Sequence, residues 1–78
     1  MAFSLFKKKS KRKQLQDLNG IPLMVGDKVD CLRYEMGESI LIEGENGFEY
    51  ESVETGQKVS FARMIDAATS FQKVRKLN

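Results

Sequence analysis

The sequence predicts an all-β domain of five short strands in a meander, preceded by a flexible basic N-terminal arm. Turn-forming residues punctuate the chain at short intervals from residue 19 onward, and the runs between them have the length and the β-branched or aromatic content of strands. The composition, 41% apolar and 31% charged, is that of a globular protein, because it is too apolar for wholesale disorder. These two observations define the fold class.

The chain has 78 residues, which is enough for one domain. The boundary of this domain falls at Asn19-Gly20-Ile21-Pro22, where three turn-forming residues meet. Residues 1–18 are therefore expected to be the basic, disordered arm, and residues 19–78 the folded domain. A domain of this size buries only about 60% of its unfolded surface. The single cysteine, Cys31, cannot form an internal disulfide to support it.

The first four predicted strands are separated by turns that contain glycine. Alternation is clearest in Phe48-Glu49-Tyr50-Glu51, which places the two rings on one face of the sheet and the two carboxylates on the other. Just before it, Asn46-Gly47 favours a tight hairpin, because both residues tolerate the positive φ that a two-residue type I′ turn requires. The strands are expected at Lys28–Tyr34, Ser39–Glu43, Phe48–Glu54 and Lys58–Ile65.

The C-terminal stretch fits two structures. Its apolar residues follow a helical stripe and its central alanines favour helix, which would make the fold α+β with a helix over residues 62–77. Against this, two stretches of the sequence are alike: residues 55–59 and residues 69–74 each begin with threonine and end with Gln-Lys-Val, with one or two residues in between. The first copy is a turn that leads into a strand. If the second is built in the same way, residues 66–70 form a tight connection and Phe71–Leu77 the fifth strand, which is the structure we expect.

The first predicted strand is entered through Gly26-Asp27-Lys28-Val29. Five short strands in a meander, with one tight turn before the last, resemble the small barrel of the Src-homology-3 (SH3) type. The tetrapeptide resembles the way in which many such barrels, including KOW modules of ribosomal and transcription proteins, enter their first strand. The resemblance covers residues 20–77 as architecture and four residues as sequence. It implies that the meander closes into an SH3-like barrel. It assigns no ligand, because the glycine-rich continuation of a KOW motif is missing after Tyr34.

The charge of the chain is divided between its two parts. Six of the seven positions from residue 7 to residue 13 are cationic, and Asp17 is the only acid before residue 19, so residues 1–18 carry a formal charge of +5 and the remainder −3. Such a run can neutralise phosphates and release their counterions, so we expect RNA or another polyanion as partner. The same cations beside Phe3, Leu5 and Phe6 also fit an anionic membrane surface, or a tail that only aids solubility. The cations are Lys7, Lys8, Lys9, Lys11, Arg12 and Lys13.

A second basic group lies near the C-terminus. On a fifth strand, Lys73 and Arg75 share one face, and Arg63 is expected across from them on the neighbouring strand. With Lys76 and the arm, these residues are expected to form a stripe that follows a phosphate backbone. The alternative is a solvated edge strand that its charges protect from aggregation.

Two tyrosines are candidates for stacking on bases. A small barrel needs most of its aromatic side chains for its core, so Phe48 and Phe61 are expected inside. Tyr34 and Tyr50 are then the aromatic residues left as candidates for the surface, where a ring can stack on an unpaired base. The alternative for Tyr50 is a place in the core.

The chain offers no recognisable catalytic or metal-binding constellation. It has no histidine and one cysteine, which removes the commonest general base and the usual zinc ligands. The glutamates around the predicted hairpin alternate on an exposed face, so they lack the burial that separates the pKa values of catalytic acids. Cys31 has no identifiable base beside it. We therefore expect no enzyme activity, no cofactor and no metal.

The sequence therefore predicts a non-enzymatic accessory binding protein that contacts RNA or a ribonucleoprotein. Two other functions stay open: a protein-interaction adaptor that uses the acidic hairpin or an open strand edge, and a peripheral membrane-surface protein. No apolar stretch has the length of a membrane span, and the apolar and basic residues at the N-terminus stand in the reverse order of a secretory signal. The expected location is the cytoplasm.

Overall fold

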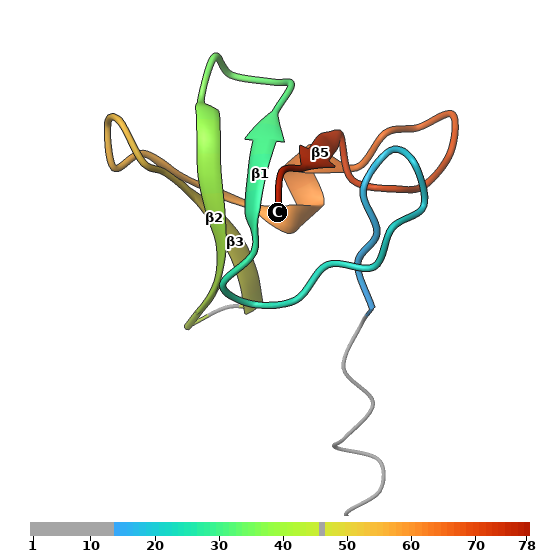
Figure 1. Cartoon of the computed structure of the whole chain (residues 1–78), viewed down its shortest axis with the longest axis horizontal. Coiled ribbons are helices and arrows are strands. Elements are labelled where there is room, and N and C mark those ends of the chain that lie inside the picture. The colour runs from blue at the N-terminus through green and yellow to red at the C-terminus, as the bar shows by residue number, and fades with distance from the viewer. Residues whose placement is uncertain (1–13, 46) are drawn as a thin grey trace, which may run out of the picture.

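The protein folds as one antiparallel sheet of five strands (Figure 1), as seen in a computed structural model that describes residues 14–45 and 47–78. The sheet order is β4-β3-β2-β1-β5, and every neighbouring pair is antiparallel. The described part of the chain contains no α-helix, so the all-β class is confirmed. The strands are β1 (Lys28–Cys31), β2 (Gly37–Gly44), β3 (Gly47–Ser52), β4 (Lys58–Ser60) and β5 (Val74–Lys76), with a 3-10 helix, η2 (Phe61–Met64), between the last two.

The first four strands form the predicted meander, and the fifth returns to the first. Asp30 of β1 stands opposite Glu38 of β2 on one side and Arg75 of β5 on the other. In this pairing β4 and β5 are the two edges, so the strand ladder itself is an open sheet. A hairpin is present where Asn46-Gly47 predicts one, but Gly47 pairs with Gly44 and begins β3, so it does not stand at the centre of the turn as predicted.

The core lies on the face of the sheet that the alternation predicts. Tyr50 is fully buried, and Phe48, two residues earlier on the same face, is half-buried against the core. The ring of Phe48 meets that of Phe61 edge-to-face, with centroids 6.4 Å apart. Both phenylalanines therefore pack against the core half-buried and do not lie inside it as expected. The buried apolar side chains are Leu15, Leu23, Val29, Cys31, Met36, Leu41, Tyr50, Val59, Met64 and Val74.

The fourth strand is shorter than predicted, because the chain turns into η2 at Phe61. The single helical turn buries Met64 completely, while a straight strand would have carried residues 61–65 past the core. Arg63 consequently lies on η2 and not on a strand face.

The alternative of a helix over residues 62–77 is wrong, and the tight connection followed by a fifth strand is confirmed. The backbone N–H of Asp66 donates to the carbonyl of Phe71 at 2.8 Å and closes the connection, and the Thr69 hydroxyl donates to the Asp66 carboxylate at 2.9 Å. Such local bonds from side chain to neighbouring groups compete with helix formation. The strand itself, β5, covers only the centre of the predicted range.

Residues 14–18, which the sequence assigns to the arm, pack against the sheet. Leu15 is 5% exposed and Asp17 1% exposed. The carbonyl of Leu15 accepts from Leu23 N–H at 2.8 Å, and Leu18 N–H donates to Val74 of β5 at 3.0 Å. Figure 1 shows this blue segment beside the orange-red chain that leads into β5. The packed part of the chain therefore includes residues before 19, because they cover the outer edge of β5. The basic run at residues 7–13 lies outside the described residues.

Candidate nucleic-acid interface

The three predicted cations on and beside β5 are each paired with a carboxylate. Lys73 Nζ lies 3.3 Å from Asp66 Oδ1, and Arg75 Nη2 lies 3.4 Å from Asp30 Oδ2, the residue opposite it on β1. Lys76 Nζ lies 3.4 Å from Asp27 Oδ2. A phosphate at these positions would compete with an acid that is already present.

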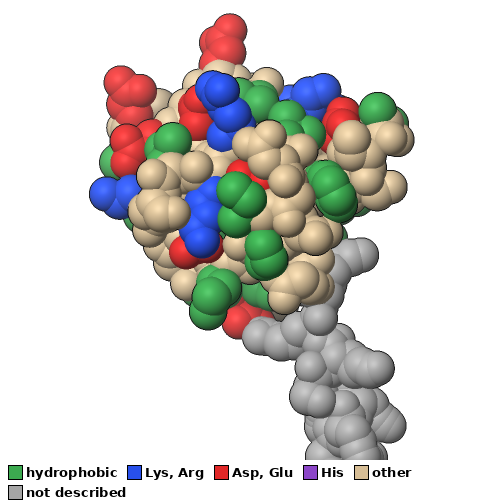
Figure 2. Space-filling view, turned by 45° about the vertical axis from the view of Figure 1, so that its right-hand side comes forward, with side chains coloured by type: hydrophobic (Ala, Val, Ile, Leu, Met, Phe, Trp, Pro, Cys, Tyr) green, Lys and Arg blue, Asp and Glu red, His purple; other side chains and the backbone are tan. Residues whose placement is uncertain are grey.

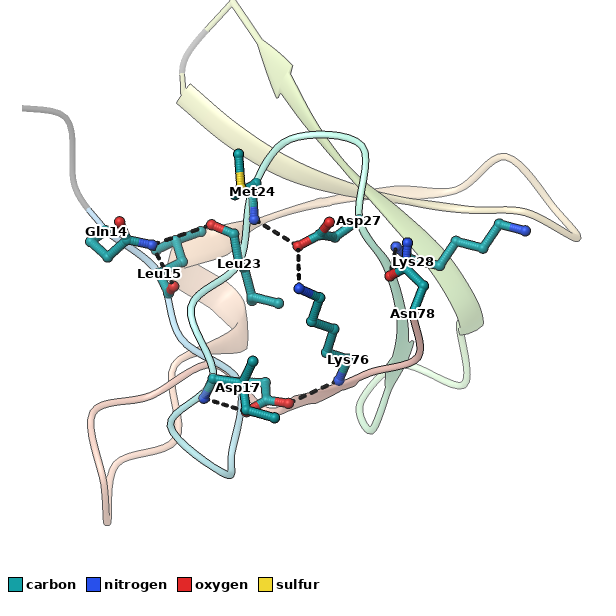
Figure 3. A network of polar contacts seen from close by, with 10 residues as sticks. Gln14, Leu15, Asp17, Leu23, Met24, Asp27, Lys28, Lys76 and Asn78 are labelled. Atoms are coloured by element: carbon teal, nitrogen blue, oxygen red, sulfur yellow. Dashed lines mark hydrogen bonds and ion pairs between the residues drawn. The ribbon is translucent and has the colours of Figure 1, made fainter.

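Lys76 belongs to a network that holds the N-terminal segment onto the sheet (Figure 3). Its backbone N–H donates to Asp17 Oδ2 at 2.9 Å, and its ammonium group faces Asp27, whose Oδ2 also accepts from Met24 N–H at 2.8 Å. The Lys76 side chain is only 24% exposed. Lys76 therefore has a structural role in holding the N-terminal segment on the sheet.

Arg63 lies at a different place from the one predicted, because the neighbour of β5 is β1 and not β4. Its carbonyl, in the last turn of η2, accepts two side-chain bonds from the loop between β1 and β2. Arg33 Nη1 donates at 2.8 Å and the Tyr34 hydroxyl at 3.5 Å. The structure thus joins two predicted residues, Arg63 and Tyr34, to one that sequence reasoning missed, Arg33. We call these three residues the Tyr34 cluster.

The two guanidinium groups of the Tyr34 cluster differ from the cations of β5 in their partners. Among residues 14–45 and 47–78, no carboxylate forms an ion pair with Arg33 or Arg63. Figure 2 shows one face of the molecule on which blue cationic side chains lie close to red carboxylates. Four of the seven cations in the described residues form such pairs. The Tyr34 cluster is therefore the part of the described surface where cations and an exposed ring occur together without a bound acid.

Tyr34 is held in a backbone conformation that a bulky residue rarely adopts. Its φ is +59° and that of Glu35 is +53°, within a turn in which Met36 N–H points to the Arg33 carbonyl at 3.4 Å. A left-handed residue other than glycine costs about 1 kcal/mol or more. The turn keeps the Tyr34 side chain 47% exposed, at the tip of the loop.

Tyr50, the other tyrosine proposed for stacking, is not on the surface. It is fully buried, and its hydroxyl donates to Gln72 Oε1 at 2.7 Å. Burial raises the pKa of Tyr50, so the phenol stays neutral. The alternation from Phe48 to Glu51 puts the Tyr50 ring on the same face of the sheet as Phe48. The alternation is therefore a better guide to the position of Tyr50 than the count of aromatic residues that the core needs.

Cys31 is a core residue. It is 5% exposed, and burial raises the pKa of its thiol, so little thiolate forms near neutral pH. No group of three or more metal-ligating side chains occurs within the described ranges.

An open groove lies at the hairpin of β2 and β3, where the sequence places the acidic surface. It is lined by Ile42, Glu43, Gly44, Glu45, Glu49 and Lys58. Lys58 stands at one side of the groove and offsets part of the negative charge. This groove is the place at which the predicted protein-interaction surface would lie.

Comparisons with protein-family models, with curated proteins and with solved structures gave no match. None of the helical segments in residues 14–45 and 47–78 has the length and hydropathy to cross a bilayer.

Proposed function

We propose that the protein is a non-enzymatic accessory protein that binds RNA, alone or in a ribonucleoprotein, in the cytoplasm. The basic run of residues 7–13 supplies most of the affinity. The observation that carries this proposal is the state of Asp17, the only acid before residue 19. Its carboxylate is buried and accepts backbone N–H groups from Asn19, Ile21 and Lys76. The sole acid near the run in sequence is thus occupied by backbone N–H groups of the fold.

Binding through this run follows from counterion release. Each phosphate that a lysine or arginine neutralises frees condensed cations into solution, so the binding constant falls as salt rises. Arg33 and Arg63 add to this term, because no described carboxylate pairs with them. Lys73 and Arg75 add less, since each must first give up a carboxylate at 3.3–3.4 Å.

We also propose that the sheet is the wall of a small SH3-like barrel. The strand order β4-β3-β2-β1-β5 and the single turn of η2 before β5 support this. Between the two edge strands, Ile65 forms an isolated bridge with Gln72, and Lys73 N–H donates to the Met64 carbonyl at 2.6 Å. These contacts tie the chain after β4 to the chain before β5.

The function is tested by changing the six cations of residues 7–13 to glutamine in the full chain and measuring affinity for a short single-stranded RNA across a salt series. The slope of log K against log salt is about 0.7 per phosphate contact on single strands. Loss of all six contacts should therefore reduce the slope by about 4. A slope that stays the same would contradict the proposal.

The matched control changes Lys73 and Arg75 to glutamine and leaves residues 7–13 intact. Both side chains are at least one-third exposed, so the fold should tolerate the change. We expect a reduction in slope of less than about 1, because these cations are already paired. An effect equal to that of the N-terminal variant would place the interface on β5 instead.

One observation favours a second candidate, a peripheral membrane protein. Met24 is 69% exposed and Val25 51% exposed, in a loop to which Gln14 is bonded through the Leu23 carbonyl at 3.3 Å. Two apolar side chains therefore stand beside the residue that follows the basic run, as in surfaces that combine charge with shallow insertion. Vesicles of phosphatidylserine and phosphatidylcholine test this. Changing Met24 and Val25 to serine should weaken vesicle binding and leave RNA binding unchanged.

A further inference from the structure

We propose that the Tyr34 cluster is a binding site for one unpaired base of a single-stranded RNA, with Tyr34 stacking on the base and Arg33 and Arg63 contacting the adjoining phosphates. This inference rests on the proposed function and names the form of RNA that the protein prefers.

The geometry first supplies a ring that is exposed and fixed. Tyr34 is 47% exposed, and its position is set by a turn with two successive residues at positive φ. Its hydroxyl reaches the Arg63 carbonyl at 3.5 Å. A tyrosine has few side-chain torsions to immobilise, so a ring held in this way loses little entropy when a base stacks on it.

The geometry then supplies a cation next to the ring, Arg33, while Arg63 carries a second guanidinium on the residue whose carbonyl both side chains contact. Arg33 Nη1 is bonded to the Arg63 carbonyl at 2.8 Å, which uses one of the five N–H donors of a guanidinium. The remaining donors of Arg33, and all those of Arg63, are not paired with a carboxylate of the described residues. Guanidinium groups bind phosphate oxygens through paired N–H donors. Cations that alternate with a ring are the arrangement by which proteins track a single strand.

The site discriminates between single strands and duplexes. In an A-form duplex the faces of the bases are covered by stacking, so a ring at a loop tip can reach only the backbone and groove edges. In a single strand a base can turn out and cover the ring. The basic run of residues 7–13 binds the phosphates of either form. Preference for single strands must therefore come from Tyr34.

The test measures the affinity of the full chain for a fluorescein-labelled oligouridine and for an RNA duplex of equal length. Tyr34→Ala should lower the affinity for oligouridine about tenfold and change the affinity for the duplex by less than about twofold. Tyr34→Phe keeps the ring and should keep the preference. Val53→Ala removes an apolar side chain of comparable exposure, 55%, from another loop and should change neither affinity.

Ring resonances give a second readout. The chain has two tyrosines and no tryptophan, so the two tyrosines are easily distinguished by NMR. Oligouridine should shift the ring protons of Tyr34 and leave those of buried Tyr50 in place. Unshifted Tyr34 protons, with equal binding of single strand and duplex and an intact salt slope, would overturn this site and leave the proposed function standing. Absence of RNA binding at moderate salt, or binding of phosphatidylserine vesicles in its place, would overturn both.

Discussion

Asp17 shows how one buried side chain organises the N-terminal part of the fold. Its two carboxylate oxygens accept three backbone N–H groups, from Asn19 at 2.8 Å, Ile21 at 3.0 Å and Lys76 at 2.9 Å. Burial by itself raises the pKa of this carboxyl, but the three N–H donors and the charge of Lys76 outweigh burial and hold the pKa below its usual value of 3.8. The charged form is therefore the one that the fold stabilises.

Asp17→Asn should destabilise the protein by about 2–4 kcal/mol, because hydrogen bonds to a charged acceptor are lost and an amide N–H₂ faces a backbone donor. The sign of the pH dependence follows from the lowered pKa. Stability from Asp17 is fully present above the unfolded pKa near 3.8 and disappears as pH falls through the lower folded pKa. Urea denaturation as a function of pH measures this.

The variant provides its own control for that pH dependence. Below the folded pKa, Asp17 is protonated in both states of the wild-type protein, so the gap in unfolding free energy between wild type and Asp17→Asn should narrow on acidification. A gap that widens in acid would mean that the pKa is raised and that the carboxylate does not carry the network.

Tyr50→Phe tests the one buried bond between side chains that joins β3 to the chain before β5. The Tyr50 hydroxyl and Gln72 Oε1 are 2.7 Å apart, and Gln72 is 2% exposed. The change leaves the Gln72 oxygen buried without a donor, so thermal or urea denaturation should show a loss of about 1–2 kcal/mol. Affinity for RNA should not change. A weakened affinity would mean that Tyr50 acts at the interface after all.

At the scale of elements, the loop between β1 and β2 carries strain. Glu35→Gly should stabilise the protein by about 1 kcal/mol, because glycine adopts the φ of +53° without the steric cost that glutamate bears. Urea denaturation measures the gain. The matched control is Glu38→Gly on β2, where the backbone is extended and glycine should cost about 0.5–1 kcal/mol. Equal losses of stability in the two variants would mean that the turn is not strained.

Elements that are determined by residues close together in the sequence are predicted well. The hairpin between β2 and β3 follows from Asn46-Gly47, and the core face of β3 follows from the alternation that begins at Phe48, because both signals lie within a few residues. The end of β4 does not follow, since Val59, Phe61 and Ile65 fit one strand face, while Phe61 and Met64, three residues apart, fit a helical turn. Only packing under the sheet decides that Met64 is buried by a turn of η2.

The residues of the candidate site also differ in how well the sequence predicts them. Arg63 and Tyr34 were predicted by residue type, but their meeting depends on a bond from the Tyr34 hydroxyl to the Arg63 carbonyl that spans 29 positions of the chain. Arg33 was missed because no local pattern marks it. The pairing of Arg75 with Asp30 likewise depends on β5 lying next to β1, which the spacing of strands along the sequence does not reveal.

For the whole molecule, the N-terminal segment acts as part of the domain and as the base of the basic run. Besides Asp17, it supplies the buried Leu15 and backbone bonds to the chain around β5, from Gln72 N–H to Gln16 and from Leu18 N–H to Val74, at 2.8 and 3.0 Å. The outer edge of β5 is thus covered by the chain's own N-terminal part. An uncovered strand edge invites pairing with other chains, so this cover protects the fold.

The contribution of residues 14–18 to the stability of the fold can be measured with two truncated chains, one that begins at Gln14 and one that begins at Asn19. The first removes the basic run and keeps Leu15 and Asp17, so we expect a folded monomer that has lost most of its affinity for RNA. The second removes a buried leucine and a carboxylate with three donors, a combined loss of at least about 4 kcal/mol. A small domain has roughly 5 kcal/mol in total, so the second chain should be largely unfolded or associated through β5, as circular dichroism and size-exclusion chromatography would show. If both chains are equally stable monomers, residues 14–18 are a tail and the edge of β5 needs no cover.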